Sequence, residues 1–193
     1  MTDARRSFGF SFVPPSGPVR KTWEDEPLED PEDYVCLVMT ACSALAKTDA
    51  RFRIGGFGTQ DWGFDIGYDM SSFVEELPEL VEGLRSGTPV EIYLYPQGVD
   101  RTLVFEPAGG EVVVKCFDHR NPNSPPKEEM HRRKDLEAMV AELAVEFARS
   151  LETVAPAVFR LEPFCRWKDG DTSDTDQLSG PCGTAGRSEQ ETG

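Results

Sequence analysis

The longest regular apolar pattern in the chain lies within residues 128–154, and it constrains the fold more than any other feature. Apolar side chains recur there every three or four residues over about five turns, which is typical of one face of an amphipathic helix. Pro156 follows, and proline cannot continue a helix because it lacks the amide hydrogen. The sequence therefore predicts a long helix within 128–154. Its apolar stripe consists of Leu136, Met139, Val140, Leu143, Phe147, Leu151 and Val154.

A second amphipathic pattern covers residues 71–87 and predicts another helix. Ser72 and Glu75 have the spacing of a capping box, and Gly87 suits the C-terminal end of a helix. Pro78 interrupts the pattern, so we expect a kink or a broken first turn. The apolar stripe consists of Phe73, Leu77, Leu80, Val81 and Leu84, and the glutamates at 75, 76, 79 and 82 cover the solvent side.

Three segments between the two helices read as strands, because they are short and rich in β-branched and aromatic residues. They are residues 90–95, 101–106 and 111–117. Gly109 and Gly110 separate the last two, and such a glycine pair predicts a tight hairpin turn. After the long helix, residues 157–167 are predicted to pack as a last strand or as coil.

Two segments share the pattern Phe-x-Ile-Gly at a spacing of twelve residues, namely 52–57 and 64–69. The glycine-rich stretch between them resembles a turn, so the pattern predicts a β-hairpin. Phe52, Ile54, Phe64 and Ile66 would then face inward. On the outer face, Arg53 would lie across from Asp65, as an opposite-charge pair that contributes about 0.2 to 1 kcal/mol.

An unbroken apolar run at residues 34–45 is compatible with either a buried strand or a buried helix, since periodicity does not separate the two. Its β-branched and aromatic residues favour a strand. Its alanines favour a helix, for which Asp30 and Pro31 would serve as N-cap and first residue. We expect a strand, because the segment that follows supplies a plausible turn into residues 51–57.

The order of these elements predicts an α+β fold: a mostly antiparallel sheet of about five or six strands with two helices packed on one face. A Pro- and acid-rich N-terminal arm (1–33) precedes a single α+β domain (34–167), and a disordered acidic tail (168–193) follows it. Within the arm, Phe8, Phe10, Phe12 and Val13 alternate, so they either add an edge strand or dock as a hydrophobic arm.

The charge of the chain narrows the classes of partner. With 35 acidic and 20 basic residues, the formal net charge is -15 and the isoelectric point is about 4.5. Such a field repels nucleic acids and anionic membranes and attracts basic partners. We therefore expect a basic protein partner, with no nucleic acid and no membrane, and leave the oligomeric state open.

The absence of targeting signals and of metal-binding motifs from the sequence leads to predictions of cellular location and of cofactors. No secretory signal pattern and no apolar stretch long enough to span a bilayer is present, which favours a cytoplasmic protein. The five cysteines include no CxxC pair and the chain has two histidines, which argues against a zinc site. We expect no metal and no cofactor.

Asp61, Asp65 and Asp69 follow one another at intervals of four residues, with apolar residues at even positions between them. On a strand, four residues span about 13 Å, so neighbouring carboxylates of this set cannot share a cation. The spacing instead describes either a solvated strand face or a docking surface for a basic partner. Glu75, Glu76 and Glu79 extend the same acidic surface.

The turn at residues 93–101 concentrates aromatic and charged side chains, namely Tyr93, Tyr95, Asp100 and Arg101. Aromatic residues and arginine are the usual anchors of protein interfaces, although turn chemistry also explains the proline and glycine of this segment. A pocket near His119 and Arg120, between the sheet and the helices, is the alternative site. On a strand, Cys116 and Asp118 share a face and His119 points away.

The stretches FRIGGFG, DWGFDIGYDMSSFVEELPELVEGLRSG and EIYLYPQGVDRTLVF resemble small bacterial α+β proteins of uncharacterised families, such as the immunity proteins of polymorphic toxin systems. The likeness covers residues 34–165 and contains no diagnostic motif. It implies a non-enzymatic protein whose acidic surface caps a basic toxin. The sequence thus predicts a non-catalytic, acidic binding protein, and the alternative is a small-molecule-binding or enzymatic domain with its pocket near His119.

Overall fold

The computed structural model describes residues 7–17, 30–95 and 99–172, which form an α+β fold. The strands are β1 (Gly9–Val13), β2 (Arg51–Gly55), β3 (Val90–Leu94), β4 (Arg101–Ala108), β5 (Glu111–Asp118) and β6 (Lys127–Arg132). The helices are α1 (Tyr34–Leu45), α2 (Asp69–Val74), α3 (Leu77–Ser86), α4 (Arg133–Val154), α5 (Pro156–Phe159) and α6 (Phe164–Trp167).

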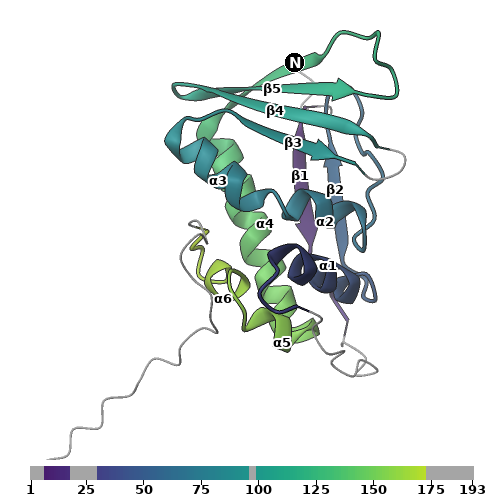
Figure 1. Ribbon diagram of the computed structural model, residues 1–193, viewed down its shortest axis with the longest axis vertical. Coiled ribbons are helices and arrows are strands. Elements are labelled where there is room, and N and C mark those ends of the chain that lie inside the picture. The colour runs from purple at the N-terminus through teal and green to yellow at the C-terminus, as the bar shows by residue number, and fades with distance from the viewer. Residues whose placement is uncertain (1–6, 18–29, 96–98, 173–193) are drawn as a thin grey trace, which may run out of the picture.

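The strands form two antiparallel sheets, β1-β2 and β3-β4-β5-β6. The four-stranded sheet lies at one end of the molecule, with α3 and α4 beneath it, and α1, α5 and α6 gather at the other end (Figure 1). The small sheet runs along α4 between the two ends. The prediction of an α+β fold with antiparallel pairing is confirmed. The prediction of one sheet covered by two helices is wrong, because the described residues form two sheets and six helices.

The four-stranded sheet contains the three predicted strands and one that the sequence did not indicate. The predicted hairpin joins β4 and β5, with Gly109 in the left-handed region at φ 66°. The additional strand, β6, pairs with β5 and places Met130 opposite Val113. Its sequence, KEEMHR, has one apolar residue and overlaps the start of the segment predicted to contain the long helix. That helix is confirmed, but it begins at Arg133.

The small sheet overturns the predicted hairpin between residues 52–57 and 64–69. Strand β2 pairs with β1, so Phe12 faces Phe52 and Ser11 lies opposite Arg53. The pairing of Arg53 with Asp65 is therefore wrong. Residues 64–69 instead lead through a turn into α2. The prediction of which side chains face inward is confirmed, and the buried set is Phe52, Ile54, Phe64 and Ile66.

Strand β1 confirms one of the two alternatives for the N-terminal phenylalanines, since they add a strand. The rings of Phe8 and Phe10 are buried in the core and contact rings from distant segments. Phe8 lies 5.8 Å from Phe105, and Phe10 lies 4.8 Å from Phe73, between ring centroids. Residues 18–29, which carry most of the acidic N-terminal run, lie outside the described residues.

Residues 34–45 form helix α1, so the expectation of a strand is wrong. Asp33 is the N-cap, and its Oδ1 accepts hydrogen bonds from the backbone N–H groups of Val35 and Cys36 at 2.9 and 3.2 Å. The sequence shows no helical periodicity here, because the exposed positions of the helix also carry apolar residues, such as Val35 and Met39. The buried positions recur at helical spacing, namely Leu37, Val38, Ala41, Cys42, Ala44 and Leu45.

The segment 71–87 divides into α2 and α3, as Pro78 in the first turn of α3 predicts. Gly87 ends α3 in the left-handed region at φ 75°, which confirms that prediction too. The prediction of a capping box formed by Ser72 and Glu75 is wrong. Ser72 lies inside α2, where its hydroxyl donates to the carbonyl of Asp69 at 2.8 Å, and Glu75 follows the last residue of α2.

After α4 the chain forms two short helices, α5 and α6, and not the predicted strand or coil. Phe164 and Trp167 of α6 are buried against Phe147 of α4, with ring centroids 5.8 and 6.3 Å from it. Thr172 is also buried, and its hydroxyl accepts a hydrogen bond from Arg85 at 3.1 Å. The predicted disordered tail begins at residue 168. Residues 168–172 belong to the described structure, and residues 173–193 lie outside it.

Candidate functional site

The three spaced aspartates do not form a strand face. Asp61 Oδ1 accepts from the backbone N–H of Gly63 at 2.8 Å, and Asp65 Oδ1 accepts from that of Tyr68 at 2.8 Å. Asp69 Oδ2 accepts from the N–H of Asp65 at 3.0 Å, and burial raises the pKa of the Asp69 carboxyl. These carboxylates stabilise the loop that leads into α2. Among the described residues, no cluster of three or more His, Cys, Asp or Glu side chains is placed to hold a metal ion.

Three half-exposed tyrosines and a histidine form a continuous row on the surface, which we call the tyrosine row. Tyr68 meets Tyr95 edge to face at 6.4 Å, Tyr95 lies 6.3 Å from Tyr93, and Tyr93 meets His119 edge to face at 5.7 Å. The exposed fractions of Tyr68, Tyr93 and Tyr95 are 50%, 50% and 45%. The row connects the loop before α2, which carries Tyr68, with the C-terminal ends of β3 and β5.

Acidic side chains hold the tyrosine row in place. The hydroxyl of Tyr93 donates to Asp100 Oδ1 at 3.1 Å, and that of Tyr95 donates to Glu75 Oε2 at 3.4 Å. The bond to Asp100 raises the pKa of Tyr93, and burial followed by the charge of Glu75 raises that of Tyr95. Both phenols therefore stay protonated and donate hydrogen bonds at neutral pH. The structure thus brings together five of the residues that the sequence singled out, namely Glu75, Tyr93, Tyr95, Asp100 and His119.

A groove beside the row is lined by carboxylates. It has a volume of about 550 Å³, and Tyr34, Pro78 and Val90 form part of its wall. Burial, and then the charge of Glu76, raise the pKa of Glu75; burial, and then the charge of Glu79, raise that of Glu76. The fold therefore keeps like charges close together here. The acidic residues of the groove are Glu75, Glu76, Glu79 and Glu82.

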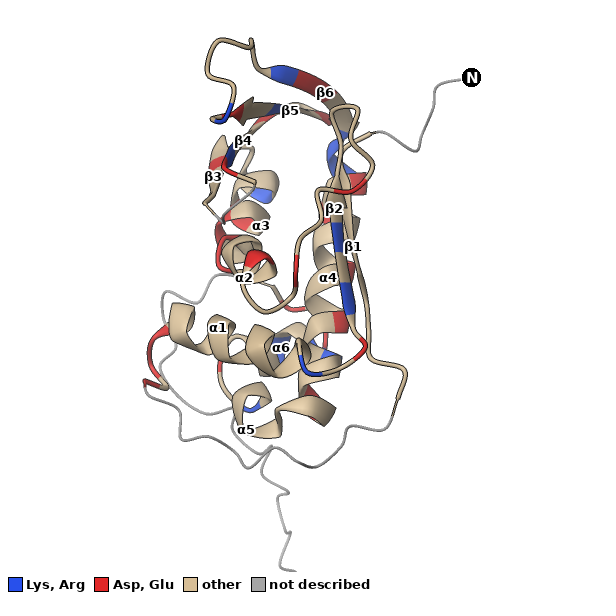
Figure 2. Ribbon diagram, turned by 90° about the vertical axis from the view of Figure 1, so that its right-hand side faces the viewer, with Lys and Arg blue, Asp and Glu red and all other residues tan. Residues whose placement is uncertain are grey.

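This part of the chain carries much of the acidic excess. Residues 54–84 contain seven acidic and no basic residues. Within the described residues none of these seven carboxylates forms an ion pair. Most carboxylates of β4, β6 and α4 have a cationic partner, such as Glu106 with Lys115 at 2.7 Å. Figure 2 shows acidic positions on α2 and α3, and basic ones on β2. We call the groove and the tyrosine row together the acidic face.

Arg101 does not belong to the acidic face, although it is adjacent to Asp100 in sequence. Side chains alternate along β4, so Arg101 points to the opposite side of the sheet from Thr102. Its guanidinium lies 4.4 Å from the ring centre of Trp62 and 3.8 Å from Asp118 Oδ2. The sequence predicts an interface anchor at Arg101, but its side chain lies on the other face of the sheet and contacts Trp62 and Asp118.

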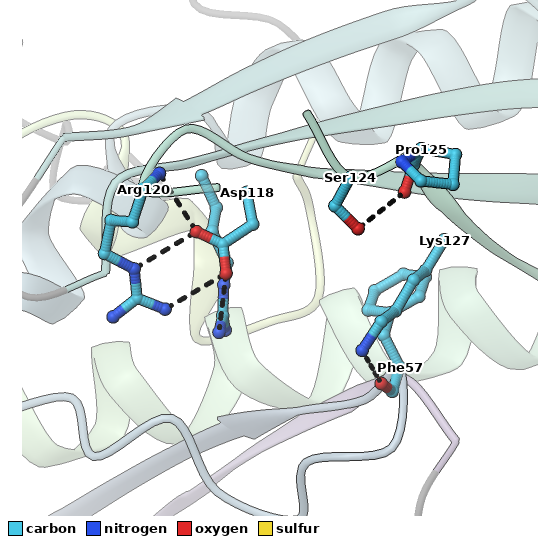
Figure 3. A network of polar contacts seen from close by, with 7 residues as sticks. Phe57, Asp118, Arg120, Ser124, Pro125 and Lys127 are labelled. Carbon is cyan, nitrogen blue, oxygen red and sulfur yellow. Dashed lines mark hydrogen bonds and ion pairs between the residues drawn. The ribbon is translucent and has the colours of Figure 1, made fainter. Parts of the chain in front are cut away.

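The alternation also separates Cys116 and Asp118 from His119. Cys116 and Asp118 share a face and line a small pocket, whereas His119 joins the tyrosine row, where its Nε2 lies 2.8 Å from Thr102 Oγ1. This arrangement confirms the predicted directions of the three side chains. Arg120 donates to both carboxylate oxygens of Asp118 at 3.1 and 3.2 Å, which lowers the pKa of Asp118 (Figure 3).

The pocket itself encloses about 130 Å³ between β4, β5 and the loop after β2. Besides Arg101, Cys116 and Asp118, it is lined by Gly56, Phe57, Thr59, Trp62, Asn121, Ser124, Pro125 and Lys127. Sequence reasoning did not connect Trp62 and Lys127 with this site, or Tyr68 with the tyrosine row. Local sequence carries no signal for these positions, because the residues that meet there come from separate elements. Trp62 contacts Arg101, Lys127 contacts Phe57, and Tyr68 contacts Tyr95.

None of the helices formed by the described residues is both long and apolar enough to cross a lipid bilayer. Comparison of the chain with protein-family models, curated proteins and solved structures gives no match.

The raised pKa values of Glu75 and Glu76 lead to a pH-dependent prediction. Because the folded state binds protons more tightly at these sites than the unfolded chain, stability falls as pH rises through their titration range. We expect Glu75→Gln/Glu76→Gln to raise the melting temperature at pH 7. The gain should vanish below about pH 4, where the glutamates are protonated in both states.

Melting curves across this pH range measure the effect. Glu142→Gln, at an exposed position of α4, is the matched control and should leave the melting temperature unchanged. If the melting temperature rises equally at pH 7 and pH 4, the negative charges of the two carboxylates are not what destabilises the fold.

Proposed function

We propose that the chain is a non-catalytic binding protein whose acidic face docks a basic protein partner. The observation that carries the proposal is the combination of carboxylates that form no ion pair with any described residue and three adjacent half-exposed tyrosines. Tyrosines are frequent anchors of interfaces, because they bury a large area with few rotatable bonds. Carboxylates around them would set the sign of the partner's charge.

The energetics of the groove support a cationic occupant. Like charges at Glu75, Glu76 and Glu79 repel one another, and burial disfavours their charged forms. Lysine or arginine side chains of a partner would relieve both effects on binding. The same field would raise the association rate and exclude acidic competitors, both of which decline with added salt.

The class of partner follows from the resemblance to immunity proteins. We propose a basic toxin domain as the partner, with neutralisation of the toxin as the outcome of docking. Such a role requires no catalytic residue on this chain.

The test is affinity capture from an extract of the native cell at low salt, followed by purification of the captured protein and measurement of its affinity. We expect a basic protein whose affinity falls as salt increases. Glu76→Gln/Glu79→Gln should weaken binding about tenfold or more, because close charge pairs across an interface contribute 1.5 kcal/mol or more. Tyr95→Ala should weaken it by a similar factor.

The matched control is Glu111→Gln/Glu142→Gln, which removes the same charge at exposed positions of β5 and α4. Its affinity should stay within about twofold of the original protein. The proposal is wrong if no basic protein is captured at low salt, if salt leaves the affinity unchanged, or if both double variants weaken binding equally.

A further inference from the structure

The small pocket between β4, β5 and the loop after β2 concentrates hydrogen-bond donors. Arg101, Lys127 and Trp62 all line it, together with the side chains of Asn121 and Ser124. Its position on the inner side of the sheet separates it from the tyrosine row. The chemistry of its walls therefore indicates a second ligand, distinct from the partner of the acidic face.

Arg101 is the central cation of the pocket. Its side chain is 13% exposed, and its guanidinium stacks on Trp62 at 4.4 Å. The nearest carboxylate, Asp118, lies at 3.8 Å, which is beyond hydrogen-bond distance, and is already held by Arg120. Within the described part of the chain, Arg101 donates no hydrogen bond. Its N–H groups are therefore available to an acceptor in the pocket, with which they would form charge-assisted hydrogen bonds.

Two further donors have unused capacity. Trp62 Nε1 is buried and has no hydrogen-bond partner among the described residues, although a buried indole N–H usually finds one. The Nζ of Lys127 donates to the carbonyl of Phe57 at 3.0 Å (Figure 3). Since an ammonium group has three N–H donors, that bond leaves others available.

The backbone beside the pocket is strained. Phe57 has a φ of 55°, in the left-handed region that bulky side chains rarely adopt. Its N–H donates to Glu129 and its carbonyl accepts from Lys127, so β6 holds the strained residue from both sides. Strain that the surrounding structure maintains in this way is typical of binding sites.

We propose that this pocket binds a small molecule through an oxyanion group, a carboxylate or a phosphate, held between Arg101 and Lys127. The ring of Trp62, on which Arg101 stacks, forms part of the wall beside it. A volume of about 130 Å³ suits one such group with a few attached atoms. The charges favour an anion, because the residues that line the pocket include two cations, Arg101 and Lys127, and one carboxylate, Asp118, which Arg120 already binds.

The test uses the indole N–H signals of the three tryptophans in the ¹⁵N-labelled full chain. Inorganic phosphate and acetate are titrated separately at constant ionic strength, with chloride as the balancing anion. We expect a saturable shift of one indole signal, which Trp62→Phe removes from the spectrum. Arg101→Gln should weaken the response about tenfold or more, because it removes a charge-assisted donor.

Arg53→Gln is the matched control, since it removes an exposed arginine from β2 and should leave the titration unchanged. Should Arg101→Gln unfold the protein, Lys127→Gln at the exposed rim provides the second variant, with the same expected loss. A response to phosphate alone identifies a phosphate ligand, and a response to acetate alone identifies a carboxylate. If the Trp62 signal responds to neither anion, or responds equally in Arg101→Gln and the original protein, the proposal is overturned.

Discussion

Replacement of Trp167 by alanine is expected to destabilise the folded protein by about 3 to 5 kcal/mol, the range for deletion of a large buried aromatic side chain. Trp167 is 2% exposed and lies 5.4 Å from Phe164, which it meets edge to face. Both rings pack on Phe147 at the middle of α4. The indole therefore fills the space between α4 and α6, and its loss would leave a cavity that these helices cannot close.

Urea denaturation followed by circular dichroism measures this loss as a shift of the midpoint at constant slope. Phe159→Ala is the comparison, because Phe159 is only partly buried at the end of α5. It should cost less than half as much. Equal effects of the two substitutions would contradict the expectation that packing of the Trp167 indole stabilises the core more than packing of the Phe159 ring.

Replacement of Glu129 by alanine is expected to destabilise the protein by about 2 to 4 kcal/mol, since hydrogen bonds to a charged group contribute about 1.5 to 3 kcal/mol each. Glu129 of β6 accepts the backbone N–H groups of Phe8 and Phe57, and the hydroxyl of Ser7 lies 3.2 Å from its Oε2. One carboxylate thus joins three parts of the chain: β6, the start of β1 and the loop after β2.

Glu128→Ala is the matched control. Glu128 is next to Glu129 in sequence, but its side chain is 55% exposed and its carboxylate lies 3.9 Å from Lys115. It should change stability by less than about 1 kcal/mol, as exposed ion pairs usually do. Urea titration of both variants provides the comparison. If Glu129→Ala is no more destabilising than Glu128→Ala, the carboxylate does not connect these segments.

Several elements could be predicted from local sequence, because their determinants lie within one turn or one strand pair. The stripe from Leu136 to Val154 indicates α4, and Gly109 and Gly110 indicate the hairpin of β4 and β5. Pro78 indicates the break between α2 and α3. In each case the signal is a spacing or a special residue that acts on its immediate neighbours.

Other elements depend on contacts between distant segments. Strand β6 has little apolar character, and it forms because Glu129 and the pairing with β5 hold it in place. Strand β2 has apolar residues suited to several partners, and it pairs with β1 across about 40 residues. The type of element at residues 34–45 was ambiguous for the same reason, since the apolar run would be buried either as helix or as strand.

The candidate sites divide in the same way. Composition alone determined that the protein is strongly acidic, and the sequence identified Tyr93, Tyr95, Glu75 and Asp100 as surface residues of interest. Only the tertiary structure decided that Tyr68 and His119 complete the tyrosine row and that Arg101 faces Trp62 and Lys127 across a pocket. Periodicity reports which face a side chain occupies on its own element. Which side chains then meet is decided by the packing of elements far apart in the chain.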